Sequence, residues 1–364
     1  MANHAPTDPL VSLVLPIRNE ARYIESGLGA IDAQTYPRDR IEIIVVDGGS
    51  TDGTLEVITR RMSTDSRIRL LGGPGVNTPA AMRIGAEAAS GDIIVKVDGH
   101  GSLNDRFVEV AVGALSADPR LGCVGGLIRP LATTNVERAI AIARFSRIGV
   151  GRGVYTLSRR AQETDTVQCG AYRRQALDDA GGFDPDMAYG EDEELNHRVR
   201  RAGWRILLHP AMQFSYHVRP TLDALFRQYF RYGRARVAVV RKHPSFFKLK
   251  HAVPAALVLG LGTSVVLVPF RGWLVGLALW GGYIAFVLFG AIILAVQHRF
   301  ARPELVAASL VALHAGYGLG TLRGLFDRPS TSAYGSAQRL ERAPRARTEG
   351  DGVTDQARPE QHQR

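Results

Sequence analysis

A nearly continuous apolar run that ends in an aspartate and a glycine-rich turn does most to constrain the fold of this chain. The run begins at Ile41, and the whole stretch reads IEIIVVDGGSTDG, with Asp47 directly after the last valine. Apolar side chains at consecutive positions are typical of a parallel strand that helices cover on both faces. Open α/β sheets bind nucleotides at the carboxyl ends of such strands. The stretch therefore predicts a nucleotide site at Asp47, the alternative being a plain turn with a solvent-facing carboxylate.

The chain around this stretch alternates strands with helices. Strands are predicted at 11–17, 41–46, 67–71 and 93–97, and a helix is expected to open at Asn19 and Glu20. Further helices are expected after the glycine turn and at 78–89. Such alternation indicates right-handed βαβ units and a parallel sheet. The first part of the chain should therefore form an α/β nucleotide-binding fold.

A second polar group follows the strand predicted at 93–97. Asp98 and His100 are separated only by Gly99, so both side chains can converge on one ion. A divalent cation held there would neutralise a diphosphate, and the imidazole nitrogen favours Mn²⁺ over Mg²⁺. The competing interpretation is that the triplet is only a turn.

A third polar group opens a helix predicted after Gly190. Glu191 and Asp192 stand in its first turn, where the helix dipole favours carboxylates, so Asp192 should be ionised near neutral pH. An ionised carboxylate in a cleft is a candidate general base. Helix capping by an acidic surface turn would explain the same residues without catalysis.

Taken in order, these groups resemble the motifs of the family 2 glycosyltransferases. The family's opening, a strand followed by Pro-x-x-Asn-Glu, is matched by residues 16–20, and its aspartate-rich run by residues 47–54. The resemblance covers roughly residues 10–240 and looks most like the bacterial succinoglycan branch, which carries carboxyl-terminal membrane helices. It implies a nucleotide-diphospho-sugar transferase fold, a mostly parallel sheet in two abutting βαβ halves, followed by transmembrane helices.

The resemblance assigns donor-binding roles to several residues. Asp47 would face the uracil of a UDP-sugar, and Pro16 and Glu20 would line the same pocket. His217, expected near the end of a later strand, would help to bind the diphosphate or the metal. UDP-sugar is therefore the implied donor.

The resemblance also assigns the metal and the base. Asp98 and His100 match the family's metal triplet, which is usually Asp-x-Asp, so the histidine is a departure. Mn²⁺ or Mg²⁺ is the implied cofactor. Glu191 and Asp192 match the family's Glu-Asp pair, which makes Asp192 the expected catalytic base.

These roles imply an inverting glycosyltransferase that moves a hexose, from UDP-glucose or a similar donor, to a lipid-linked saccharide in exopolysaccharide or cell-surface polysaccharide synthesis. The Gln-x-x-Arg-Trp motif of processive synthases appears with Tyr232 in place of Trp, which favours single-sugar addition. Two alternatives stay open: a polyprenyl-phosphate hexosyltransferase, and a catalytically inactive nucleotide-sugar-binding membrane subunit. Polysaccharide-assembly proteins are possible partners.

Long apolar runs predict a membrane segment over residues 252–323. Residues 252–270 and 272–296 contain no charge and would form helices of about 28 and 37 Å, enough to cross the hydrocarbon core. Residues 305–322 are a weaker third candidate, and a buried soluble hairpin is the alternative. Basic flanks place the catalytic domain, residues 10–245, in the cytoplasm of a multi-pass protein of the bacterial inner membrane.

Composition narrows the partners further. The chain has 45 Lys and Arg against 35 Asp and Glu, and much of the excess surrounds the apolar segments, which suits an anionic membrane surface. An arginine-rich and aromatic run at 226–236 is expected at the membrane interface. No RNA- or DNA-binding motif accompanies these charges, so no nucleic acid is expected as partner.

Two cysteines indicate a reducing compartment. Tails at 1–9 and 328–364 are expected to flank the folded parts.

Overall fold

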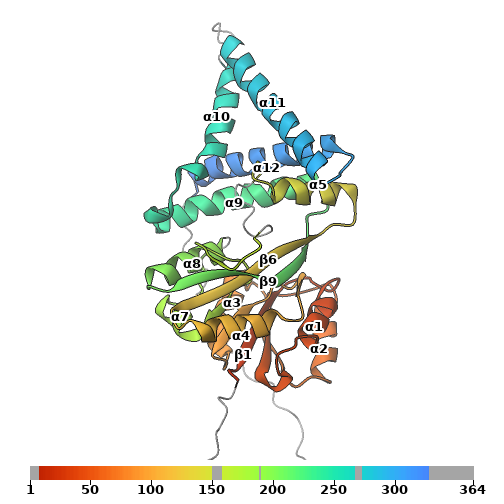
Figure 1. The fold of residues 1–364 in the computed structure, drawn as a ribbon, viewed down its shortest axis with the longest axis vertical. Coiled ribbons are helices and arrows are strands. Elements are labelled where there is room, and N and C mark those ends of the chain that lie inside the picture. Colours follow the sequence, from red (N-terminus) through yellow and green to blue (C-terminus); the bar gives the residue numbers. More distant parts are fainter. Residues whose placement is uncertain (1–7, 150–157, 188–189, 267–272, 328–364) are drawn as a thin grey trace, which may run out of the picture.

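The computed structural model describes residues 8–149, 158–187, 190–266 and 273–327. The tail expected at 328–364, and most of the one expected at 1–9, lie outside these residues. Figure 1 shows a sheet with helices on both faces at one end of the molecule, a layer of helices across the middle and a helical hairpin at the other end.

The first half of the sheet is parallel, as its apolar runs predict. Its order is β3-β2-β1-β4, formed by β1 (Val11–Ile17), β2 (Ile41–Asp47), β3 (Ile68–Gly72) and β4 (Ile93–Lys96). All residues of β1 and β4 are buried because helices cover both faces. The strands run in one direction, so Asp47 and the residues that follow Lys96 lie together at the carboxyl ends of the strands. We call this end the carboxyl edge of the sheet and the opposite end its amino edge.

The second half of the sheet is mixed, and the α/β fold class is confirmed. The strands are β5 (Gly101–Leu103), β6 (Leu121–Leu131), β7 (Gln162–Glu163), β8 (Ala171–Arg173) and β9 (Arg205–His217). β6 and β9 are parallel, whereas β8 runs antiparallel between β4 and β6. The reversal arises because the chain leaves β6, passes through α5 (Asn135–Arg144) and re-enters the sheet from the carboxyl edge.

Helices cover the two faces of the sheet and form two apolar cores with it. One core takes side chains from α1 (Ile24–Asp32), α2 (Thr54–Met62) and α4 (Phe107–Ala117). The other takes side chains from α3 (Thr78–Ala88), α7 (Arg174–Asp179) and α8 (Glu191–Arg201). The helix expected to open at Asn19 and Glu20 begins only at Ile24, and Asn19 itself lies outside the helical region with a left-handed φ of 58°.

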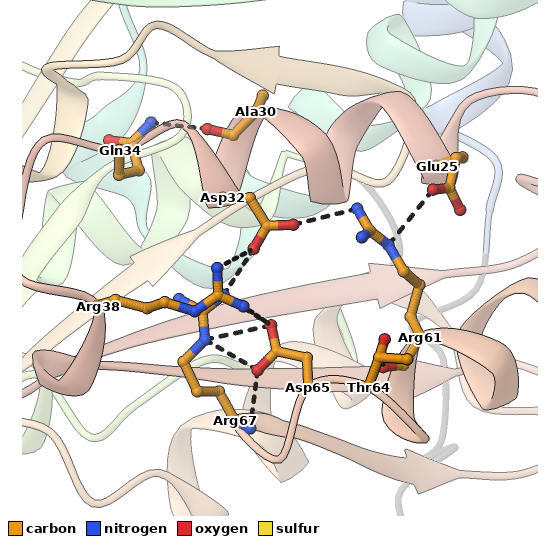
Figure 2. A network of polar contacts seen from close by, with 9 residues as sticks. All are labelled: Glu25, Ala30, Asp32, Gln34, Arg38, Arg61, Thr64, Asp65 and Arg67. Carbon is orange, nitrogen blue, oxygen red and sulfur yellow. Dashed lines mark hydrogen bonds and ion pairs between the residues drawn. The ribbon is translucent and has the colours of Figure 1, made fainter.

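A network of ion pairs ties these helices together at the amino edge of the parallel strands (Figure 2). Asp65 and Arg67 precede β3 and pair at 2.6 Å, and Arg67 also reaches Asp32 at the end of α1 at 2.6 Å. Arg38, just before β2, bonds to Asp65 at 2.9 Å, and Arg61 of α2 reaches Asp32 at 3.2 Å. The network lies at the edge opposite Asp47, so it serves the fold rather than the site.

Two helices that are far apart in the sequence form the middle layer, α9 (Leu222–Lys242) and α12 (Pro303–Gly324). They pack backbone to backbone at glycines: a side chain on Gly233 would overlap the carbonyl oxygen of Tyr317, and one on Gly320 that of Phe230. Tyr229 of α9 is 2% exposed and joins the core below. Along the run at 226–236 most residues are half-buried, while Arg227 and Arg234 are exposed, and its place at a membrane interface stays a prediction.

The hairpin consists of α10 (Val253–Val266) and α11 (Trp273–Gln297), which rise away from this layer and converge at their far ends (Figure 1). α10 starts against the carboxyl-terminal third of α12, where Gly318 packs on the carbonyl of Pro254. The carboxyl end of α11 packs on α5 and the start of α12 through Val287, Ala291 and Leu294 among others. Most large apolar side chains further along the hairpin are exposed.

Two of these helices, α11 and α12, are long and apolar enough to cross a membrane by length and composition. More than half of the most apolar stretch of α12 is buried inside the protein, against 28% for α11. The span expected at 252–270 gives a described helix of 14 residues, and residues 267–272 lie outside the described part of the chain.

Candidate active site

Asp47 ends β2 and organises the glycine turn that follows it. Its carboxylate is 5% exposed and accepts hydrogen bonds from the amides of Gly49 at 2.8 Å and Ser50 at 3.0 Å, and from the Ser50 hydroxyl at 2.5 Å. Gly49 has a φ of 91°, which glycine adopts without strain. The solvent-facing alternative is wrong for Asp47. The carboxylate faces its own turn, so contact with a uracil stays a prediction.

The turn after β2 is bonded to the loop after β1. Asn19 donates its amide to the Ser50 hydroxyl at 2.9 Å, and its side-chain oxygen accepts from the Thr51 amide at 2.8 Å. Glu20 donates its amide to the Thr54 hydroxyl at 2.8 Å. These bonds explain the left-handed Asn19, whose short polar side chain tolerates that conformation. The two loops form one unit at the carboxyl edge.

Glu20 connects this unit to His100. Its Oε1 lies 3.3 Å from His100 Nδ1, and Gly99 fits closely against Glu20 and Pro16, with an added Cβ 3.1 and 3.5 Å from their atoms. Burial disfavours the charged imidazole, but the Glu20 hydrogen bond and the nearby Asp98 outweigh burial and raise the pKa of His100 above its ordinary value. Pro16, Glu20 and His100 are thus brought together.

Asp98, Glu191 and Asp192 meet at the ammonium group of Lys96. Lys96 Nζ lies 2.8 Å from Glu191 Oε1, 2.8 and 2.9 Å from the two Asp192 oxygens, and 3.6 Å from Asp98 Oδ1. The Lys96 side chain is only 2% exposed, and the Glu191 and Asp192 side chains are 17% and 16% exposed. β4 and α8, which are remote in sequence, therefore build one charged cluster with three carboxylates and one ammonium.

The charges in this cluster shift one another's pKa values. Burial raises the pKa of Asp192 to about 7, helped by Glu191 and Asp98 and opposed by Lys96. Burial acts against the charged Lys96, but the three carboxylates outweigh it and raise the pKa of Lys96 well above its usual value. Burial likewise opposes ionisation of Asp98, yet Lys96 and His100 hold its pKa below the ordinary range. Asp192 is therefore only partly ionised near neutral pH, less than its place at the helix start predicts, because burial favours the neutral carboxyl.

His217 lies beside the same loops. It ends β9, and its ring stacks on Tyr23 at a centroid distance of 4.7 Å, while the Tyr23 amide bonds to the Glu20 carbonyl at 2.8 Å. Arg219, two residues on, is close enough to oppose protonation of His100. His217 and Arg219 thus stand beside the loops that hold Glu20 and His100, and diphosphate binding by His217 stays a prediction.

Asp98 and His100 carry donor atoms of the kinds that can hold a divalent cation together with phosphate oxygens of a substrate. Asp98 offers a carboxylate and His100 an imidazole, and Glu20 at Nδ1 is the kind of partner that orients a ligating histidine. The described residues contain no group of three or more His, Cys, Asp or Glu side chains placed to hold a metal. Mg²⁺-type sites commonly use one or two protein donors, with phosphate and water completing the shell.

Sequence reasoning missed Lys96, Cys169 and Arg219. The signal for Lys96 was present: it is a cation in an apolar strand, two residues before Asp98, so both side chains share a face. A lysine is almost never fully buried unless it is paired. Cys169, whose thiol lies 3.8 Å from Asp98 Oδ2, and Arg219 gave no such signal, because their neighbours come from distant segments.

Comparisons with known proteins identify the family of the chain. The model of Glycosyl transferase family 2 matches residues 12–181. The succinoglycan biosynthesis protein ExoA of Rhizobium meliloti is 28% identical over 86% of this chain and 94% of that protein. Glycosyltransferase AglE of Haloferax volcanii is 30% identical over 64% of this chain and 75% of that protein.

Among solved structures, the mannosyltransferase PcManGT from Pyrobaculum calidifontis, in complex with GDP-Man and Mn²⁺, superposes with a TM-score of 0.58 and 22% identity over 89% of each chain. This likeness, together with the sheet and its carboxyl-edge loops, defines a nucleotide-sugar transferase fold. The chain belongs to glycosyltransferase family 2, and it is a glycosyltransferase.

Proposed function

We propose that this glycosyltransferase moves a hexose from a UDP-sugar, UDP-glucose or a similar donor, to a lipid-linked saccharide with inversion of configuration. The observation that carries the proposal is the meeting of Asp98, Glu191 and Asp192 at Lys96, beside the loops that hold Glu20 and His100. A role in exopolysaccharide or cell-surface polysaccharide synthesis is supported by similarity to the succinoglycan protein over most of both chains.

In this proposal Asp192 takes the proton from the acceptor hydroxyl as that hydroxyl attacks the anomeric carbon. Lys96 bonds to both Asp192 oxygens and fixes the plane of the carboxylate. A single displacement from the face opposite the leaving group turns an α-linked donor into a β-linked product. Arg219 and His217 stand where they can bind the departing diphosphate. A divalent cation bound through Asp98 and His100 would neutralise further charge on the diphosphate.

The test is release of the nucleoside diphosphate, UDP or GDP, by purified full-length protein in lipid nanodiscs with Mn²⁺, measured for a panel of UDP- and GDP-sugars. Acceptors are lipid-linked saccharides from bacterial membranes, with polyprenyl phosphate alone as the comparison. Turnover that requires the saccharide supports the proposal, whereas equal turnover on bare polyprenyl phosphate would assign the hexosyl-lipid alternative. UDP binding without turnover on any acceptor would identify an inactive nucleotide-sugar-binding subunit and refute the proposal.

We also propose that the α10–α11 hairpin anchors the protein in the bacterial inner membrane, with the catalytic domain in the cytoplasm. The hairpin exposes large apolar side chains, such as Leu277, which is 65% exposed, and Phe289, which is 68% exposed. The acyl chains of a membrane would cover these side chains. α12 lies across the base of the hairpin and is largely buried, so it would rest at the surface rather than cross (Figure 1).

Tryptophan fluorescence tests this arrangement. Trp273 and Trp280 lie on the hairpin and are 54% and 41% exposed, whereas Trp204 lies in the catalytic domain. Brominated acyl chains should quench the emission of a Trp204→Phe protein in nanodiscs, and they should leave a variant that retains only Trp204 unquenched. Equal quenching of both proteins would reject this placement of the hairpin.

A further inference from the structure

The first turn of α8 carries four acidic residues, and its neighbours hold them from two sides. Glu191 and Asp192 face Lys96 of β4. The next residue, Glu193, points to α9, where its Oε2 pairs with Arg236 Nη2 at 2.6 Å. The proposed base thus lies between a lysine of the sheet and an arginine of the middle layer.

Arg236 contacts more than its acidic partner. Its Nε donates to the hydroxyl of Tyr317 on α12 at 3.1 Å, and its guanidinium lies 5.0 Å from the centre of the Phe246 ring. The Arg236 side chain is 16% exposed. A guanidinium presents five donors in a rigid plane, so one side chain can join α8, α9 and α12 in a fixed arrangement.

The packing of α9 on α12 keeps this arrangement fixed. Gly233, three residues before Arg236 and on the same face of α9, lies directly on the carbonyl of Tyr317. Tyr317 therefore contacts α9 through its backbone and through its hydroxyl. A tilt or shift of α12 cannot occur without moving the hydroxyl away from Arg236.

We infer that Arg236 is a positioning residue, which holds the turn carrying Asp192 in its working place only while α12 is seated on α9. The route is short: Tyr317 orients Arg236, Arg236 holds Glu193, and Glu193 is adjacent to Asp192 in the chain. Through this route the helix beneath the membrane hairpin sets the geometry of the base. The turnover measurement rests on the proposed function of Asp192, whereas the hydrogen-exchange measurement tests the inference without it.

Arg234 provides a matched control on the same helix. It forms an ion pair with Asp327, just past the end of α12, at 2.7 Å, and its side chain is 46% exposed. Arg234 and Arg236 thus both tie α9 to the α12 region through a charged hydrogen bond. Arg236 differs from Arg234 in that its ion pair extends to α8.

The experiment compares Arg236→Met, Arg234→Met and Glu193→Gln in the full-length protein in detergent micelles. The readouts are UDP release from UDP-glucose with Mn²⁺ and a lipid-linked saccharide acceptor, UDP affinity by calorimetry, and hydrogen exchange in the first turn of α8. Arg236→Met should lower kcat by about 10–100-fold, the scale expected for a misplaced catalytic group, while UDP affinity stays within about twofold. Exchange in that turn should rise in Arg236→Met but not in Arg234→Met.

Glu193→Gln should reproduce the Arg236→Met result, and the double variant should be no worse than either single one. Arg236→Lys should recover part of the lost turnover. Tyr317→Phe removes only the hydroxyl and covers the case in which Arg236→Met fails to fold; it should raise exchange in the same turn. Equal loss in Arg234→Met, a parallel fall in UDP affinity, or unchanged exchange would overturn the inference. If the wild-type protein shows no turnover on UDP-glucose, the proposed donor is refuted instead. The hydrogen-exchange data would still decide the role of Arg236.

Discussion

Asp192 is the residue on which the chemistry depends, so its replacement is the first prediction. Asp192→Asn keeps the shape of the side chain and one of the two oxygens that accept from Lys96, but it cannot take up a proton. We expect kcat to fall by about 10²–10⁴-fold, with UDP affinity changed little, because the loss falls on the transition state. The measurement is UDP release alongside UDP calorimetry. Retention of more than a tenth of the wild-type kcat would show that another group is the base.

The pH dependence of turnover follows from the pKa of about 7 at Asp192. Only the ionised form can take a proton, so kcat/KM should rise with pH through neutrality and level off above it. Lys96 lowers the pKa of Asp192, so its removal should raise that pKa and move the rise to higher pH. Rate profiles of wild type and Lys96→Met, with Lys248→Met as a control lysine that pairs outside the cluster with Asp165, test this. An unshifted profile in Lys96→Met would contradict it.

A third prediction concerns the metal preference. His100→Asp would replace an imidazole by a carboxylate and make the triplet all-oxygen. Because the imidazole is the softer ligand, the variant should bind UDP more tightly with Mg²⁺ relative to Mn²⁺ than the wild type does. Calorimetry of UDP binding in each metal gives the ratio. The same ratio in both proteins, or full wild-type activity in excess EDTA, would remove His100 from the metal site.

The residues that sequence predicted are those whose chemistry is local. The glycine turn at Asp47, the Asp98–His100 triplet and the Glu191–Asp192 pair each lie within a few adjacent positions, so pattern alone finds them. The ion pairs that hold the acidic turn of α8 come from Lys96 and Arg236, which reach it from segments far away in the chain. No local pattern specifies such pairs, since burial and topology decide them.

The same contrast appears at the scale of elements. Apolar runs predicted β1 and β2 to within a residue, because a strand covered on both faces must be apolar throughout. The start of α1 was misplaced, because Asn19 gives up helical geometry to bond to the neighbouring turn. The antiparallel β8 and the pairing of α9 with α12 depend on tertiary contacts, and sequence periodicity does not carry them.

The ion-pair network at the amino edge gives a prediction about stability (Figure 2). Hydrogen bonds from Arg67 lower the pKa of Asp65 to about 2, against an ordinary value near 3.8. The stabilisation is therefore complete above the ordinary value and is lost as the pH falls towards 2. Asp65→Asn should destabilise the protein by about 1–3 kcal/mol at pH 7 and by less at pH 3. Thermal unfolding in detergent at the two pH values measures this, and an equal effect at both would contradict it.

At the scale of the whole molecule, the catalytic domain and the apolar segment meet in one continuous packing layer. Residues of α9 and α12 belong to the same apolar core as α1, α2 and α4. A domain boundary placed near residue 245 therefore separates helices that share a core. We expect a chain cut at 245 to aggregate, because the cut uncovers the glycine-lined face of α9.

The contact between α10 and α12 suggests a variant that should be more soluble without detergent than the chain cut at 245. The chain leaves the folded body at Pro254, beside Gly318, and returns at Pro303, so the hairpin is an insertion between two points on one helix. Those points are separated by 15 helical residues, or about 22 Å, which a linker of about 12 flexible residues bridges with slack. Excision in this way also removes Val287, Ala291 and Leu294 of α11, which pack on α5 and the start of α12, so the apolar positions that they cover need polar replacements. The resulting protein should be a detergent-free monomer that keeps Tyr317 on Arg236 and binds UDP as the full chain does. Anchor and catalyst would then be separable parts, and grafting another anchor at the same two points would direct this enzyme to a different surface.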